Sequence, residues 1–150
     1  MSHAVIINAL RTPVGRASPQ NGYFRDTRAD DLSAFVIRSL VERTGIDPKL
    51  IEDVKWGCVK QEGEQGFDVA RTAALIAGLP VETPGVTIQR NCASSLTAIN
   101  MAAASAVAGG EDVQLVGGVE HMDHIPMTQN LDPSPTLFRN ASIRLMTLAR

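Results

Sequence analysis

The residue with the clearest capacity for chemistry is Cys92. It falls between a short apolar run at residues 86–89, which predicts a strand, and an alanine-rich run at residues 92–108, which predicts a helix. Unpaired N–H groups and the helix dipole at the start of such a helix favour the thiolate, which is the nucleophilic form. The same N–H groups can stabilise the oxyanion that forms when a thiolate attacks an acyl carbonyl. The position indicates acyl-transfer chemistry, and a small buried hydrophobe is the alternative.

The two cysteines of the chain have different surroundings. The three residues after Cys92 are small and leave room for a bulky acyl thioester: Ala93, Ser94 and Ser95. Cys58 instead lies inside an apolar run at residues 54–59, so we expect it to be structural. Two cysteines do not make a disulfide framework, which favours a reducing, cytoplasmic compartment.

Strand-like and helix-like segments alternate along the chain. Short apolar runs predict strands at residues 4–9, 54–59, 86–89 and 113–116. Apolar spacing, caps and glycine stops predict helices from Asp30 or Asp31 to Thr44, at residues 67–77 and at residues 92–108, with one short turn at Asp47-Pro48. Because strands and helices alternate, the strands should be parallel, and their continuous apolar character predicts helices on both faces. The expected fold class is α/β, with a mostly parallel sheet in three layers, αβα.

Other segments should be irregular. Glycine and proline mark residues 11–28 and 61–66 as loops, and prolines interrupt the chain from His121 onward. A last helix is predicted at residues 137–148.

Composition limits the partners that the chain could bind. Its 150 residues carry a formal net charge of −2, and only 4% of them are aromatic. Since no basic stretch is dense enough to release many counterions and few rings are present to stack on bases, no nucleic-acid partner is expected. The N-terminus lacks the basic segment of a signal peptide, and residues 96–108 are too few to span a bilayer, so no membrane association is expected.

Four motifs resemble those of thiolases, in the same order and at similar intervals. They are Arg11-Thr12-Pro13-Val14-Gly15, the segment from Gly57 to Gln61 with Gly63 to Arg71, Arg90-Asn91-Cys92-Ala93-Ser94-Ser95, and Gly117-Gly118-Val119-Glu120-His121-Met122. One motif alone would be weak evidence, whereas four in order are specific, and they cover residues 5 to about 127. The run from His121 to Met127 is most similar to degradative 3-ketoacyl-CoA thiolases.

The resemblance implies an activity and its partners. Cys92 would attack the 3-keto carbon of a 3-ketoacyl-CoA, expel acetyl-CoA and hold the shortened acyl group as a thioester until free CoA removes it. The implied enzyme is an acetyl-CoA C-acyltransferase of fatty-acid β-oxidation, with coenzyme A as a substrate and no permanently bound cofactor. Family members form dimers or tetramers, so the resemblance implies a homodimer or homotetramer, and a β-oxidation complex could supply a further partner.

The resemblance also implies a division of the chain. Residues 1–127 correspond to the N-terminal α/β half of a thiolase, and residues 128–150 to the start of the loop region that grips CoA. Thiolases are more than twice as long, and their base histidine, in a Gly-His-Pro segment, and their second cysteine lie in the other half. The isolated chain is therefore expected to be inactive. Gln89 and Asn91 depart from the family pattern beside the nucleophile, which leaves the acyl-chain preference open.

Three alternatives stay open at this point. A biosynthetic, acetoacetyl-CoA-type thiolase would share the same motifs. A truncated, non-catalytic assembly module would keep the fold and the interface without turnover. Ketoacyl synthases also place a nucleophilic cysteine before serines at a helix start and use carrier-protein thioesters, although the motifs at residues 11–15 and 117–127 favour a thiolase.

For the other residues that could have a functional role, a structural role is also possible. His121 and His124 are three residues apart and could suit a metal, but no third ligand type lies near them in the sequence, so no metal site is predicted. Glu120 either orients groups near the Cys92 helix or is satisfied by backbone N–H groups. The pair Gly109-Gly110 is interpreted as a helix stop, and Gly117-Gly118 lacks the lysine of a phosphate-binding loop.

Overall fold

A parallel sheet forms the centre of the computed structural model, which describes residues 3–134 and 136. The strands are β1 (Asp53–Gly57), β2 (Gly85–Ile88) and β3 (Gln114–Gly118), in the order β2-β1-β3. Both pairings are parallel, and Trp56 of the central strand lies opposite Thr87 on β2 and Gly117 on β3. Parallel neighbours need crossover connections, which the intervening helices provide.

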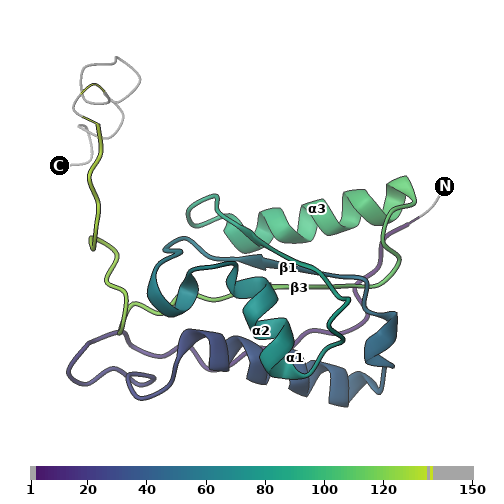
Figure 1. The fold of residues 1–150 in the computed structure, drawn as a ribbon, viewed down its shortest axis with the longest axis horizontal. Helices are drawn as coiled ribbons and strands as arrows, with labels where there is room; N and C mark the ends of the chain where they lie inside the picture. Colours follow the sequence, from purple (N-terminus) through teal and green to yellow (C-terminus); the bar gives the residue numbers. More distant parts are fainter. Residues whose placement is uncertain (1–2, 135, 137–150) are drawn as a thin grey trace.

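Helices cover both faces of this sheet (Figure 1). On one face α3 (Ser94–Ala108) packs against β1 and β3, and on the other α2 (Val69–Ala77) packs against β1 and β2, with α1 (Ala29–Thr44) beside it. Two short 3-10 helices complete the described elements, η1 (Pro48–Leu50) and η2 (Gly63–Gln65). The three-layer α/β arrangement confirms the fold class predicted from the sequence.

The hydrophobic core lies between the sheet and α2. Ala70, Ala73 and Ala74 of this helix are fully buried, and their small side chains allow the helix to approach the sheet closely. Trp56 is also buried, and its indole N–H donates a hydrogen bond to Ser33 Oγ on α1 at 3.2 Å. A buried indole needs such a partner, so this bond fixes α1 against the central strand.

The strand predicted at residues 4–9 does not form. Val5, Ile6 and Ile7 are each more than three-quarters exposed, and this segment has no strand pairing. It lies along β3 across a groove of about 730 Å³ that is lined by the N-terminal segment, α1 and β3. A strand needs a hydrogen-bonded neighbour about 4.8 Å away, and the groove separates the segment from β3. The apolar pattern was strand-like, but the pairing that makes a strand is absent here.

Two helix starts differ from the prediction. The helix predicted at residues 67–77 begins two residues later, because Phe67 (φ 49°) and Asp68 (φ 59°) have left-handed backbone. In α1 the N-cap is Arg28, and Asp30 and Asp31 lie inside the first turn rather than at the cap. Their carboxylates still suit the positive end of the helix dipole.

The helix predicted at residues 92–108 also begins later than expected. α3 starts at Ser94, and Cys92 lies in the turn before it, since Asn91 has left-handed backbone with φ 46°. Asparagine is among the few residues other than glycine that tolerate this conformation. The nucleophile candidate is therefore presented by a turn at the helix start and not by the helix itself.

The other local predictions have mixed outcomes. Asp47 accepts a hydrogen bond from the Lys49 backbone N–H at 3.0 Å, which confirms the cap before Pro48. The loop predicted at residues 61–66 contains η2. The helix predicted at residues 137–148 lies outside the described residues. Among those that are described, no helix combines the length and apolar character needed to cross a membrane.

Candidate functional site

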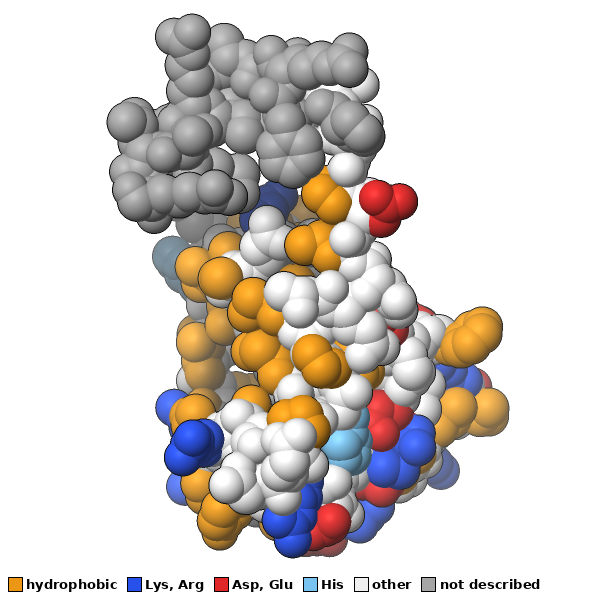
Figure 2. All heavy atoms as spheres, turned by 90° about the vertical axis from the view of Figure 1, so that its left-hand side faces the viewer, with side chains coloured by type: hydrophobic (Ala, Val, Ile, Leu, Met, Phe, Trp, Pro, Cys, Tyr) orange, Lys and Arg blue, Asp and Glu red, His pale blue; other side chains and the backbone are white. Residues whose placement is uncertain are grey.

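Cys92 lies at the edge of the sheet where all three strands end. It belongs to the connection between β2 and α3, residues 89–93, and its side chain is exposed. In Figure 1 this edge is on the left, where α3 begins, and Figure 2 views the molecule from that side. Ligands of open α/β sheets bind outside the carboxyl ends of the strands. The location is therefore suited to a reactive thiol that must meet a substrate.

A tight turn presents the thiol. The Ala93 N–H donates to the Arg90 carbonyl at 3.0 Å, and the Ser94 N–H donates to the Asn91 carbonyl at 3.1 Å. The sequence predicted that N–H groups of the first helical turn would be available to an oxyanion, but these two are already used within the turn. Asn91, with its left-handed backbone, is part of this turn.

The Ser94 side chain closes the same turn. Its hydroxyl donates to the Asn91 carbonyl at 2.6 Å and accepts from the Arg90 N–H at 2.9 Å. Ser94 is only 4% exposed, so these bonds are largely protected from water. The donor and an acceptor position of the hydroxyl are thus both satisfied inside the loop that carries Cys92.

Two glycines let the start of α3 lie directly on the sheet. A Cβ at Gly57 would come 2.7 Å from Ser95 Cα, and one at Gly118 would collide with Ser95 Oγ and the Gly57 carbonyl oxygen. Such distances are far inside van der Waals contact, so only a residue without a side chain fits at either position. The ends of β1 and β3 therefore determine where the Cys92 turn sits.

We expect Gly57→Ala to destabilise the fold by about 3 kcal/mol, because its Cβ would overlap with the α3 backbone. Chemical denaturation followed by circular dichroism would measure the loss. Gly66→Ala is a matched control, since Gly66 has a negative φ and the nearest atom to its Cβ would be 3.2 Å away. Equal losses for the two substitutions would contradict the close approach at Gly57.

Cys58 has the properties of a structural residue. It is 1% exposed, and it directly follows β1. Burial, with a smaller contribution from the negative charge of Glu120, raises the pKa of Cys58 to about 12. The protonated, enclosed thiol is not placed for nucleophilic attack.

Glu120 is satisfied by the backbone, which settles the two interpretations left open by the sequence. Its carboxylate accepts hydrogen bonds from the N–H groups of Val59 at 2.8 Å and Lys60 at 3.2 Å. It also accepts a bond from Gln65 Nε2 at 3.2 Å. The side chain thereby joins the ends of β1 and β3, and it acts as a structural link between them.

Gln65 is a site residue that the sequence analysis missed. It is completely buried, with Nε2 donating to the Lys60 carbonyl at 2.7 Å and Oε1 accepting from the His121 N–H at 2.6 Å. A glutamine in a glycine-rich loop gives no sequence signal for such burial. Its partners lie up to 56 positions away and become visible only in the folded chain.

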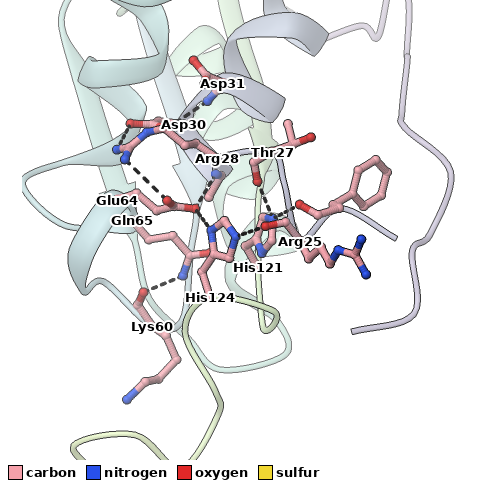
Figure 3. A network of polar contacts seen from close by, with 12 residues as sticks. Arg25, Thr27, Arg28, Asp30, Asp31, Lys60, Glu64, Gln65, His121 and His124 are labelled. Carbon is pink, nitrogen blue, oxygen red and sulfur yellow. Dashed lines mark hydrogen bonds and ion pairs between the residues drawn. The ribbon is translucent and has the colours of Figure 1, made fainter. Parts of the chain in front are cut away.

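His121 and His124 stack on each other beside Glu64 (Figure 3). Their ring centroids are 4.3 Å apart, and the planes differ by 20°. His124 Nδ1 lies 2.9 Å from Glu64 Oε1, and its Nε2 faces the Arg25 carbonyl. Since both nitrogens face oxygen acceptors, both must carry protons, and His124 is an imidazolium. The Arg25 carbonyl and then Glu64 raise the pKa of His124, in agreement with this assignment.

His121 contacts two backbone carbonyls through one of its ring nitrogens. Its Nε2 lies 2.8 Å from the Thr27 carbonyl and 3.1 Å from the Phe24 carbonyl, so this nitrogen carries the proton. Its Nδ1 is buried and has no hydrogen-bond partner among the described residues. Through Nε2, His121 anchors the loop before α1 to the segment after β3.

The two histidines and Glu64 offer one potential metal-ligand atom each, within 4.8 Å of one another. The sequence-based expectation that no third metal-ligand type lies near the two histidines was therefore wrong. Glu64 is distant from them in the sequence but close to them in the folded chain. A zinc ion would have to lie about 2.0–2.1 Å from one nitrogen of each histidine, in the plane of each ring. Nearly parallel, stacked rings do not converge, and both nitrogens of His124 already face oxygens. We interpret the cluster as an ion-pair network, and a histidine shows among acidic and basic side chains at this surface in Figure 2.

The imidazolium predicts a pH-dependent stability. Folding raises the pKa of His124. The contribution of this side chain to the stability of the fold is therefore complete below the ordinary histidine pKa, about 6.5, and is lost as the pH rises through the pKa of the folded state. We expect His124→Gln to lower the Tm more at pH 6 than at pH 9, as measured by thermal denaturation. His3→Gln, in the exposed N-terminal segment, is the control. A difference that is constant or grows towards pH 9 would refute the charged state.

Most of the chain is similar to known proteins. The N-terminal domain of thiolases matches residues 4–149. A 3-ketoacyl-CoA thiolase of Vibrio cholerae is 49% identical over 143 residues, which are 95% of this chain and 36% of that protein. The 3-ketoacyl-CoA thiolase of Saccharophagus degradans is 54% identical over 134 residues, 89% of this chain and 34% of its own length. The chain thus spans about a third of these relatives, and it belongs to the thiolase family through their N-terminal domain.

Proposed function

We propose that Cys92 is the acyl-carrying nucleophile of an acetyl-CoA C-acyltransferase that cleaves 3-ketoacyl-CoA or runs the reverse condensation. The observation that carries this proposal is the exposed thiol, presented by a left-handed turn at the carboxyl edge of the sheet. Cys58, the other thiol, is enclosed and protonated. The names of the relatives support the choice of substrate class.

The proposed chemistry balances in two steps. The Cys92 thiolate attacks the 3-keto carbon, a bond forms between Sγ and that carbon, and the bond between C2 and C3 breaks. The electron pair leaves with the acetyl-CoA carbanion, which takes up a proton. The thiol of a free CoA then attacks the acyl-cysteine thioester, forming acyl-CoA and returning the thiol to Cys92. Covalent catalysis divides one difficult carbon–carbon cleavage into two easier steps.

The proton transfers need groups other than the two stacked histidines. His121 Nε2 is committed to two carbonyls, and both nitrogens of His124 face oxygens. We therefore assign neither histidine as the general base. In the proposal, the base histidine and second cysteine come from the other half of a complete thiolase, and the isolated 150 residues carry the acyl group without turnover.

Several further assignments belong to the same proposal. Residues 1–127 would form the N-terminal half and residues 128–150 the start of the CoA-gripping loop. Gln89 donates from Nε2 to Asn91 Oδ1 at 3.2 Å beside the nucleophile, so we propose this pair as a determinant of acyl-chain preference. Coenzyme A would be a substrate, no cofactor would be permanently bound, and the enzyme would act in the cytoplasm as a homo-oligomer in fatty-acid β-oxidation.

Acylation tests this function directly. The product of the complete reading frame that contains these residues is incubated with acetyl-CoA or a 3-ketoacyl-CoA, and its intact mass is measured. We expect an acyl adduct that maps to Cys92 after proteolysis. An acyl-carrier-protein thioester as donor should be much slower. If only the carrier-protein thioester acylates the protein, it acts as a ketoacyl synthase, and if neither does, the nucleophile assignment fails.

A further inference from the structure

The buried hydroxyl of Ser94 has no role in the two chemical steps above. It nevertheless makes two hydrogen bonds inside the loop that carries the thiol, to the Asn91 carbonyl at 2.6 Å and from the Arg90 N–H at 2.9 Å. These bonds span the residues on both sides of Cys92. Two neighbouring backbone groups, the Arg90 N–H and the Asn91 carbonyl, thus have their positions set by one side chain.

The backbone that Ser94 holds is strained. Asn91 has φ 46°, a conformation that costs a non-glycine residue of order 1 kcal/mol or more and persists only when the surroundings determine it. The Asn91 carbonyl accepts from both the N–H and the hydroxyl of Ser94. Without the hydroxyl, the Arg90 N–H would lose its partner and one of the two bonds to Asn91 would be lost. The strained turn would then be free to relax.

The other supports of this turn are rigid. The start of α3 lies against Gly57 and Gly118, where no side chain could be inserted, so the helix end cannot move towards the sheet. Relaxation would therefore be concentrated in residues 90–93, which include the thiol. In covalent catalysis, misplacement of a reacting atom by about 1 Å can cost on the order of 100-fold in rate.

From this geometry we propose that Ser94 is a positioning residue, whose hydroxyl holds the Cys92 turn in the orientation needed for acyl transfer. The inference rests on the proposed acyl-carrying function of Cys92. It assigns Ser94 no contact with the substrate. Its effect should appear in the acyl-transfer rate and not in the binding of the CoA ester.

Ser94→Ala tests the role of the hydroxyl. On the product of the complete reading frame, we expect the rate of Cys92 acylation by a saturating 3-ketoacyl-CoA to fall about 10- to 100-fold. The substrate concentration for half-maximal rate should change less than about threefold, which a general loss of folded protein would not explain. Alkylation of Cys92 by iodoacetamide, a small reagent with little orientational demand, should stay within about threefold of the original rate.

Two further variants keep the test decisive. Ser94→Thr retains the hydroxyl and should recover most of the acylation rate, so this variant carries the test if the alanine protein does not fold. Ser105→Ala removes a hydroxyl that donates to Glu111 near the other end of α3, and it should leave the rate unchanged.

The outcomes separate this inference from the function on which it rests. If the unmodified protein is not acylated at Cys92, the proposed function fails and the role of Ser94 fails with it. If the protein is acylated and Ser94→Ala is acylated at the same rate, only the positioning role is overturned. A Ser94→Thr protein that is as slow as Ser94→Ala would also overturn it, because the hydroxyl would then not be the active feature.

Discussion

Replacing Cys92 with alanine should abolish acylation of the protein by 3-ketoacyl-CoA. The nucleophile supplies the sulfur atom of the covalent intermediate, and an alanine methyl group cannot replace it. In a complete enzyme, kcat should fall by at least about 10³-fold, as for other catalytic nucleophiles that act together with a base. Intact-mass analysis measures the adduct, and the release of acetyl-CoA measures turnover.

Cys58→Ala is the matched control for this experiment. Cys58 is buried at the end of β1 and is the only other cysteine of the sequence. Its replacement leaves a small cavity that we expect to cost about 1 kcal/mol of stability, while the acyl adduct persists. An adduct that disappears in Cys58→Ala and remains in Cys92→Ala would reverse the roles assigned to the two cysteines.

Iodoacetamide should modify Cys92 at least about 100-fold faster than Cys58 in the folded protein near pH 8. Cys92 is exposed, whereas Cys58 is 1% exposed and can react only when the fold opens locally. The raised pKa of Cys58, about 12, leaves about one thiol in 10⁴ ionised at this pH. Both factors act in the same direction, and peptide mapping after timed quenching measures the ratio of the two rates.

Denaturant supplies the control for the alkylation experiment. In guanidinium chloride both thiols are solvated, so the two rates should differ by less than about threefold. The selectivity is then a property of the fold and not of the neighbouring sequence. Equal rates in the folded state would show that Cys58 is reachable and would contradict its burial.

Much of the fold could be predicted because its signals are local. Apolar runs correctly predicted the three strands of the sheet, and glycines correctly predicted three helix ends. The residues at these ends are Gly45, Gly78 and Gly109, with φ of 67°, 88° and 80°. Glycine adopts this left-handed conformation without steric cost, so its meaning depends little on the rest of the molecule.

The N-terminal segment shows where local signals fail. Val5, Ile6 and Ile7 have the side chains of a strand, but a strand exists only when its backbone pairs with another. That pairing depends on the distance to β3 and on what occupies the groove between them. No pattern within residues 4–9 contains this information.

The candidate site, like the fold, could be predicted from the sequence only in part. The position of Cys92 between a strand and a helix follows from apolar periodicity and chain order, and parallel connections bring such a junction to the carboxyl edge of the sheet. The sequence by itself thus determined the fold class, the junction and the identity of the exposed thiol's neighbours.

Only the tertiary structure decided how these residues are held. The Glu64 carboxylate accepts a hydrogen bond from the Ala29 N–H, 35 positions away, and contacts the His124 ring, 60 positions away. The Gln65 side chain accepts a hydrogen bond from the His121 N–H, 56 positions away. The turn at Asn91 is closed by the Ser94 side chain, and the start of α3 fits closely against the ends of β1 and β3. Such contacts form only when several elements pack together with compatible geometry. The local propensity of one segment does not contain this information.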